Sequence, residues 1–166
     1  LKVLKTMGYN CCQLSAHSRD ISAEQLRDML DESGMTCACT HIGFQEMEED
    51  IDKVIREHKL WNCAYPGIGG LPESARTSKE GILSFMKDAN LVADKMAAEG
   101  MTFTYHNHAF EFAKVEGKTI MDYILETAND NFKLMVDVYW LSVAGINPVK
   151  FLRTYKDMVG GVHDKD

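Results

Sequence analysis

Short apolar runs alternate with longer amphipathic segments along this whole chain, and this alternation constrains the fold more than any other feature. A strand followed by a helix, repeated, builds a parallel sheet, because a parallel neighbour needs a long crossover connection. We expect strands within residues 9–15, 35–43, 61–70, 101–108, 132–140 and 160–166. Helices are expected at residues 1–7, 22–34, 46–60, 78–100, 120–128 and 147–158, and a hairpin-like or irregular piece at 109–119.

Residues that begin and end helices support this division. Ser22 and Ser78 stand at cap positions, Gly34 and Gly100 at stop positions, and Pro148 near the start of the last helix. The first long helix should bury Leu26, Met29 and Leu30, and the second should bury Met47, Ile51, Val54, Ile55 and His58. We interpret His58 as a structural residue.

Polar side chains follow one apolar run after another. They are His17, His41, the glycine-rich loop 65–70, residues 106–111, residues 137–140 and residues 163–166. A Rossmann-like sheet is disfavoured because no G-x-G-x-x-G follows the first strand. In a (β/α)8 barrel these strand ends converge on one mouth, so we predict an α/β fold, a partial TIM barrel of about six βα units.

A complete barrel typically needs about 250 residues, whereas this chain has 166. It starts in a helical pattern and stops in a strand pattern. We therefore expect one domain, residues 1–166, truncated at both ends, with the first strand and everything after the seventh missing. The broken edges should leave an exposed apolar flank and favour association into a homo-oligomer.

The formal net charge of -7 disfavours a nucleic acid partner, since phosphate recognition needs basic surface. No apolar run approaches the length of a membrane span, and no signal-peptide pattern opens the chain, so we predict a cytoplasmic protein. The five cysteines should be buried reduced thiols. A zinc site built on Cys37 and Cys39 is the alternative, which lacks two further ligands.

Five motifs, "GYNCCQLSAH", "THIG", "YHNHAFEF", "DVYWLSVAGINP" and "VHDKD", resemble in order and spacing the sugar phosphate isomerase/epimerase family. This family belongs to the xylose-isomerase-like TIM-barrel superfamily, which also contains an apurinic endonuclease branch. The resemblance covers nearly the whole chain, and "YHNHxFEF" followed by "DVYW" is its most telling pair.

The resemblance implies a divalent metal at the barrel mouth, Mn, Mg, Co or Zn. Asp137 and His163 match metal ligands of the family, and His106 stands where relatives usually carry a Glu. The last ligand, a Glu, would come from an eighth strand. Two positions depart from the family pattern: Gln13 replaces a common Glu, and Asp164 replaces the apolar residue of "HLKD".

Such a metal would polarise a sugar carbonyl and acidify the neighbouring C–H. Glu111 is then the candidate base, with a solvated loop carboxylate as the alternative, and Lys165 the candidate for stabilising the enolate oxygen. His41, His108, Tyr139 and Trp140 are candidate substrate contacts. The alternative for His108 is that it caps the strand. The alternative for the two aromatic residues is a position in the core. The glycines of the 65–70 loop are a weak signal for phosphate binding.

The predicted function is a metal-dependent sugar or sugar phosphate isomerase/epimerase. A keto-sugar or inositol dehydratase/lyase on the same site is one alternative, because enolate formation followed by loss of a β-hydroxyl gives elimination. An inactive fragment or binding module is the other. DNA repair is the least favoured activity, since it needs further metal-binding histidines and a basic groove.

Overall fold

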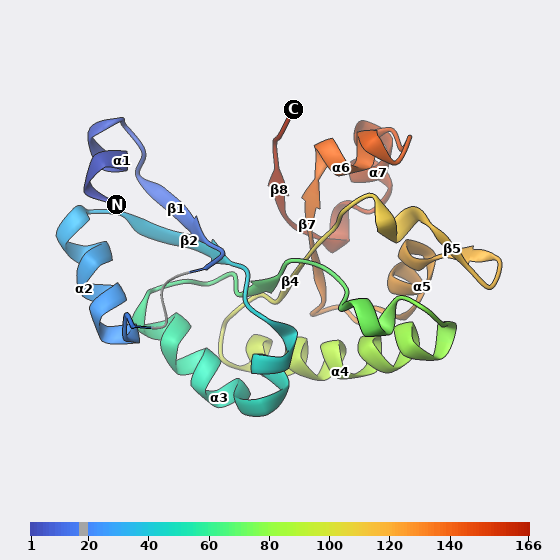
Figure 1. Ribbon diagram of the computed structural model, residues 1–166, viewed down its shortest axis with the longest axis horizontal. Helices are drawn as coiled ribbons and strands as arrows, with labels where there is room; N and C mark the ends of the chain where they lie inside the picture. The colour runs from blue at the N-terminus through green and yellow to red at the C-terminus, as the bar shows by residue number, and fades with distance from the viewer. Residues whose placement is uncertain (17–19) are drawn as a thin grey trace.

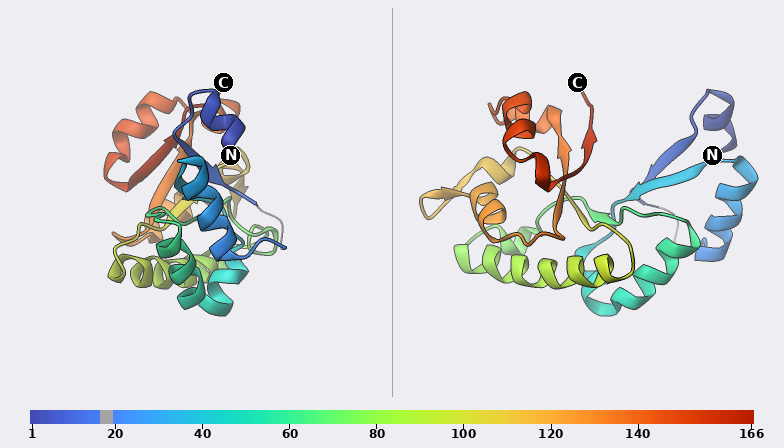
Figure 2. Two further views of the ribbon diagram at one scale, coloured as in Figure 1. Left: turned by 90° about the vertical axis from the view of Figure 1, so that its left-hand side faces the viewer. Right: turned by 180° about the vertical axis from the view of Figure 1, so that it is seen from behind.

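The computed structural model describes residues 1–16 and 20–166, and within these residues six parallel strands form the inner layer (Figure 1). They are β1 (Cys11–Leu14), β2 (Thr36–Thr40), β3 (Gly67–Ile68), β4 (Thr104–His106), β7 (Lys133–Asp137) and β8 (Val159–His163). β1 pairs with β2, and the other four pair in the order β3-β4-β7-β8. Backbone hydrogen bonds from Thr40 to Tyr65 and from Ile42 to Gly67 connect the two groups. The parallel, curved sheet expected from the sequence is confirmed (Figure 2).

Helices connect the strands, and α3 and α4 run side by side beneath the sheet in the view of Figure 1. The α-helices are α1 (Lys2–Thr6), α2 (Ala23–Ser33), α3 (Phe44–Leu60), α4 (Lys79–Ala98), α5 (Ile120–Thr127), α6 (Val138–Val143) and α7 (Pro148–Thr154). Short 3-10 turns occupy Glu73–Ala75, Phe110–Phe112 and Lys156–Met158. The irregular piece contains a small antiparallel hairpin, β5 (Lys114–Val115) and β6 (Lys118–Thr119).

The predicted helix caps are present. The Ser22 hydroxyl accepts the Gln25 N–H and the Gln25 side chain accepts the Ser22 N–H, which makes a capping box at the start of α2. Gly34 ends this helix in the left-handed conformation, with φ 63°. Ser78 caps α4 through the N–H of Gly81. Each cap satisfies backbone groups that helix ends leave unpaired.

Three expectations about the elements are wrong. The third strand does not start near residue 61 but is confined to Gly67–Ile68, inside the supposed loop. Residues 138–140 do not extend the fifth strand, because the Asp137 side chain accepts the Trp140 N–H and starts α6 there. Met29 is 43% exposed, because it lies outside the buried face of α2 that contains Leu26 and Leu30.

The main core lies between the sheet and the layer of α3, α4 and α5. His58 is buried as expected, at 1% exposure, where its ring contacts Thr40 and Trp61. A smaller core packs Cys37 and Cys63 with side chains of α2. Cys37, Cys39 and Cys63 are buried free thiols, whereas Cys11 is exposed, which contradicts the expectation for that residue. In the described part of the chain, no helix is long and apolar enough to cross a membrane.

Candidate metal centre at the carboxyl ends of the strands

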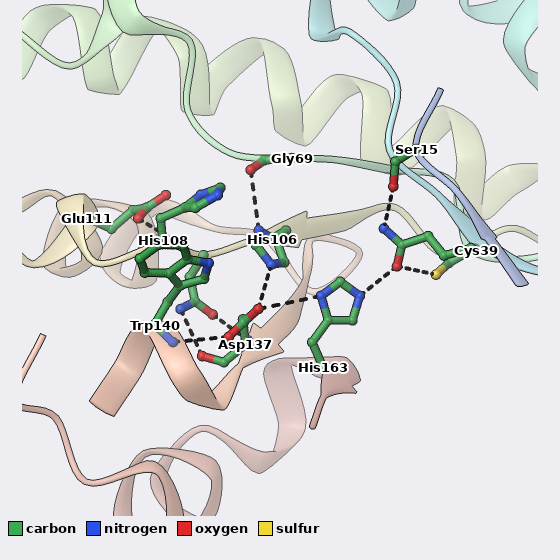
Figure 3. Close-up of polar contacts among 11 residues, drawn as sticks. Ser15, Cys39, Gly69, His106, His108, Glu111, Asp137, Trp140 and His163 are labelled. Atoms are coloured by element: carbon green, nitrogen blue, oxygen red, sulfur yellow. Dashed lines mark hydrogen bonds and ion pairs between the residues drawn. The ribbon is translucent and has the colours of Figure 1, made fainter. Parts of the chain in front are cut away.

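His106, Asp137 and His163 are the last residues of three adjacent strands, β4, β7 and β8. Parallel strands bring their carboxyl ends to one edge, so these side chains meet (Figure 3). His106 Nε2 lies 3.2 Å from Asp137 Oδ2, and His163 Nδ1 lies 3.8 Å from the same oxygen. One ligand atom from each residue lies within 4.8 Å of the other two, and no other such group occurs among the described residues.

Hydrogen bonds fix the Asp137 carboxylate, which is 1% exposed. Oδ1 accepts the backbone N–H of Trp140 at 3.0 Å. The Asn107 side-chain oxygen accepts the Asp137 N–H at 2.9 Å, which ties the ends of β4 and β7 together. Because Oδ1 is engaged in the helix cap, Oδ2 is the oxygen that faces the two imidazoles.

The far nitrogen of each imidazole has its own acceptor. His163 Nε2 lies 2.6 Å from Gln13 Oε1, and His106 Nδ1 lies 3.4 Å from the Gly69 carbonyl oxygen. When the far nitrogen donates, the near nitrogen keeps a lone pair, which then faces a carboxylate oxygen. Two imidazole lone pairs and one carboxylate around a common point are a donor set that suits a borderline divalent ion. The residues present therefore fit the metal that the resemblance implies.

His41 lies beside this group, as expected for a residue at the end of the second strand. Its ring centroid is 5.0 Å from that of His106 and 5.6 Å from that of His163. The pKa of His41 is lowered to about 4, mainly by burial and to a smaller extent by the neighbouring His106, so the ring is neutral at pH 7. Its Nε2 is buried and has no hydrogen-bond partner among the described residues, so a bound ligand would supply the missing partner.

One side of the site is formed by the other predicted contact residues. The His108 ring makes an edge contact with His106, at a centroid separation of 4.7 Å, and lies 5.3 Å from Trp140. Tyr139 and Trp140 belong to the first turn of α6, and Lys165 Nζ lies 4.8 Å and 4.9 Å from their respective ring centroids. The structure thus brings His108, Trp140 and His106 together, with Tyr139 and Lys165 next to Trp140.

Glu111 has a different environment. Its side chain is fully buried, so the alternative of a solvated loop carboxylate is wrong. One oxygen accepts the Tyr105 hydroxyl at 2.8 Å and the other accepts the His108 N–H at 2.8 Å. Burial raises the pKa of the Glu111 carboxyl to about 6, while these two hydrogen bonds lower it. Glu111 is outside the group that can share an ion, and its role as a base stays a prediction.

Sequence reasoning missed two contributors, Asn107 and Cys39, and gave Gln13 no role beyond its departure from the family pattern. Asn107 is 2% exposed and holds the Asp137 backbone. The Cys39 thiol donates to Gln13 Oε1 at 3.2 Å. The only signal for these residues was their place at or near strand ends. His17, also predicted for the mouth, lies outside the described residues.

Gly67 packs closely against the neighbouring strand β4. A Cβ atom on Gly67 would lie 2.2 Å from Thr104 Oγ1 and 2.7 Å from the Thr104 carbonyl oxygen. Only glycine permits β3 to lie this close to β4.

Comparison with known families and structures agrees with this architecture. The sequence pattern of the xylose isomerase-like TIM barrel family matches residues 1–166. No curated protein matches the sequence. The strand and helix pattern predicted a partial (β/α)8 barrel, and this is confirmed.

Many solved structures are similar to the chain, among them the following three. A sugar phosphate isomerase/epimerase from Parabacteroides distasonis ATCC 8503 superposes with a TM-score of 0.86 at 19% identity, over 99% of this chain and 68% of that one. A second protein of that description from the same organism gives 0.84 at 21% identity, over 99% and 71% of the two chains. A D-psicose 3-epimerase, solved in the presence of D-fructose, gives 0.72 at 13% identity, over 98% and 65%.

Proposed function

Because this chain belongs to the xylose isomerase-like TIM barrel family, we propose that it is a metal-dependent isomerase or epimerase of a sugar or sugar phosphate. The supporting observation is the convergence of His106, Asp137 and His163 on one point at the carboxyl ends of neighbouring strands. These three residues would hold a divalent ion, with Mn, Co, Zn or Mg as candidates. When bound, the ion would polarise a carbonyl group of the sugar and acidify the adjacent C–H.

The side chains around this point would bind and orient the sugar. Trp140 and Tyr139 offer apolar ring faces to the carbon skeleton. His41 Nε2 and His108 Nδ1 are buried and have no hydrogen-bond partner in the described part of the chain, and each can form a hydrogen bond with a hydroxyl group. Lys165 carries a positive charge next to the two aromatic rings, where it would stabilise negative charge that develops on an oxygen.

A proton must leave and return to carbon in such a reaction, and His108 suits this step better than Glu111. Burial, together with the nearby His106, lowers the pKa of His108, so the ring is neutral at pH 7 and can accept a proton. Its ring also contacts His106 directly. The Glu111 oxygens, in contrast, are already occupied by Tyr105 and by the backbone of His108.

The test is deuterium exchange. The full-length protein is loaded with Mn²⁺ or Co²⁺ and incubated in D2O with a panel of ketohexoses, aldoses and their phosphates, and NMR follows deuterium at the carbon next to the carbonyl. Deuterium uptake at that carbon, with conversion to an isomer that is one mass unit heavier for each deuterium gained, is the expected result. A product lighter by one water would instead identify a dehydratase, and the absence of exchange with every sugar would contradict the proposal.

Variants separate the two parts of the site. Asp137→Asn should lose both metal binding and exchange, because its Oδ2 faces both imidazoles. His108→Gln should keep the metal and lose exchange by a factor of about 100 or more, as expected for removal of a base. If Glu111→Gln loses exchange to that extent while His108→Gln does not, then Glu111 is the base after all.

A further inference from the structure

We infer that Gln13 is a positioning residue that determines which ring nitrogen of His163 carries the proton. The two residues are 150 positions apart in sequence, on β1 and β8, the first and last of the parallel strands (Figures 1 and 2). His163 Nε2 lies 2.6 Å from Gln13 Oε1, which is a short hydrogen bond. The consequence for metal binding rests on the proposed function, whereas the position of the proton does not.

Two neighbours fix the orientation of the Gln13 amide. Its Nε2 donates to the Ser15 hydroxyl at 2.9 Å. Its Oε1 accepts the Cys39 thiol at 3.2 Å. The thiol keeps its proton at neutral pH, because burial raises the pKa of Cys39 to about 11. Since the amide nitrogen and oxygen differ in hydrogen bonding, these contacts assign the oxygen to the side that faces His163.

An amide oxygen can only accept, so His163 Nε2 must donate. A neutral ring with its proton on Nε2 has a lone pair on Nδ1, and Nδ1 lies 3.8 Å from Asp137 Oδ2. The opposite tautomer would place a proton on Nδ1, between the ring and the carboxylate. That proton would block the one nitrogen of His163 that faces the other two ligands. Gln13 therefore keeps the ligand nitrogen of His163 available.

Loss of this acceptor should reverse the tautomer. Without Gln13 Oε1, a proton on His163 Nε2 would have no acceptor. In a half-buried position, such an unsatisfied donor raises the free energy of this tautomer. A proton on Nδ1 would instead gain the Asp137 carboxylate as acceptor. Removal of a residue that orients a ligating histidine usually lowers metal affinity by about 10-fold to 100-fold.

The test uses the full-length, metal-free protein with ¹⁵N-labelled histidine at about pH 7.5, and NMR reports which nitrogen of His163 is protonated. His163→Gln identifies the signal by its loss. Wild type should carry the proton on Nε2, Gln13→Met on Nδ1, and Gln13→Glu, which keeps an acceptor oxygen, again on Nε2. Ser15→Ala is the matched control: the Cys39 thiol still assigns the amide oxygen in this variant, so it should behave like wild type.

A proton on Nδ1 in wild type would overturn the inference, and so would the same tautomer in wild type and Gln13→Met. If Gln13→Met does not fold, wild type and Gln13→Glu still decide the question. Co²⁺ titration gives the second measurement, in which Gln13→Met should bind about 10-fold to 100-fold more weakly and Ser15→Ala within about 3-fold of wild type. If wild type binds no Co²⁺, the proposed metal centre fails while the tautomer result stands.

Discussion

Glu111 is a carboxylate without exposed surface, and this environment determines how its charge affects stability. Burial raises the pKa of Glu111 from an ordinary 4.5 to about 6 in the folded protein. Between these two values the folded protein holds a proton that the unfolded chain has lost. This group therefore favours the folded state more at acid pH than above pH 6, which is opposite to a carboxylate in an ion pair.

We predict that the free energy of unfolding of wild type, relative to Glu111→Gln, falls by roughly 2 kcal/mol as the pH rises from about 4.5 to about 6.5. Urea unfolding at several pH values measures this difference. Glu48→Gln, which removes an exposed carboxylate of α3, is the matched control against which the pH dependence of Glu111→Gln is compared. A difference for Glu111→Gln that does not change with pH would contradict the assigned environment.

The residues that carry charge or metal-ligating nitrogen were predictable from their place after apolar runs, and His41, His106, Asp137 and His163 do meet. Glu111 and Gln13 show where such reasoning stops. Glu111 is fully buried and accepts a hydrogen bond from the equally buried Tyr105, a contact that depends on tertiary packing. The partner of Gln13 lies on a strand 150 residues away, and a neutral amide gives no chemical signal in the sequence.

At the scale of the element, the helices were more predictable than the strands. α2, α4 and α7 each begin beside a residue whose local chemistry starts a helix, Ser22, Ser78 or Pro148, and this chemistry is readable from the sequence. β3 is two residues long and rests on a close approach to β4, which depends on the tertiary structure. Residues 138–140 were expected to end a strand but begin α6, because the Asp137 side chain caps this helix in addition to its place in the candidate site.

Gly67 offers a test of the close approach of β3 to β4. We predict that Gly67→Ala lowers the free energy of unfolding by about 1–3 kcal/mol or more, because the added methyl group would overlap backbone and side-chain atoms of Thr104. Gly69→Ala is the matched control two residues away, where the nearest atom is His41 Nδ1 at 3.7 Å, an ordinary contact. Its effect should stay within about 0.5 kcal/mol. Equal losses in the two variants, measured by chemical unfolding, would contradict this explanation.

At the scale of the whole molecule, the three candidate ligands, His106, Asp137 and His163, come from strands that are far apart in the sequence. The β4-β7-β8 arrangement places them within 4.8 Å, whereas an unfolded chain holds them far apart. An ion that needs all three therefore binds the folded state alone and stabilises the molecule by mass action. Metal binding and folding should thus be coupled.

We predict that Co²⁺ or Zn²⁺ at about 100 times its dissociation constant stabilises the folded protein by about 2.7 kcal/mol, which raises the thermal midpoint by roughly 5–10 °C. Excess chelator should reverse the shift in a melting experiment followed by circular dichroism. Asp137→Asn should abolish the shift, because the carboxylate oxygen that faces both imidazoles is replaced. Asp164→Asn removes the same charge from an exposed residue beside His163 and should keep the full shift. An equal shift in wild type and Asp137→Asn would mean that the ion binds elsewhere, for example at the exposed Cys11.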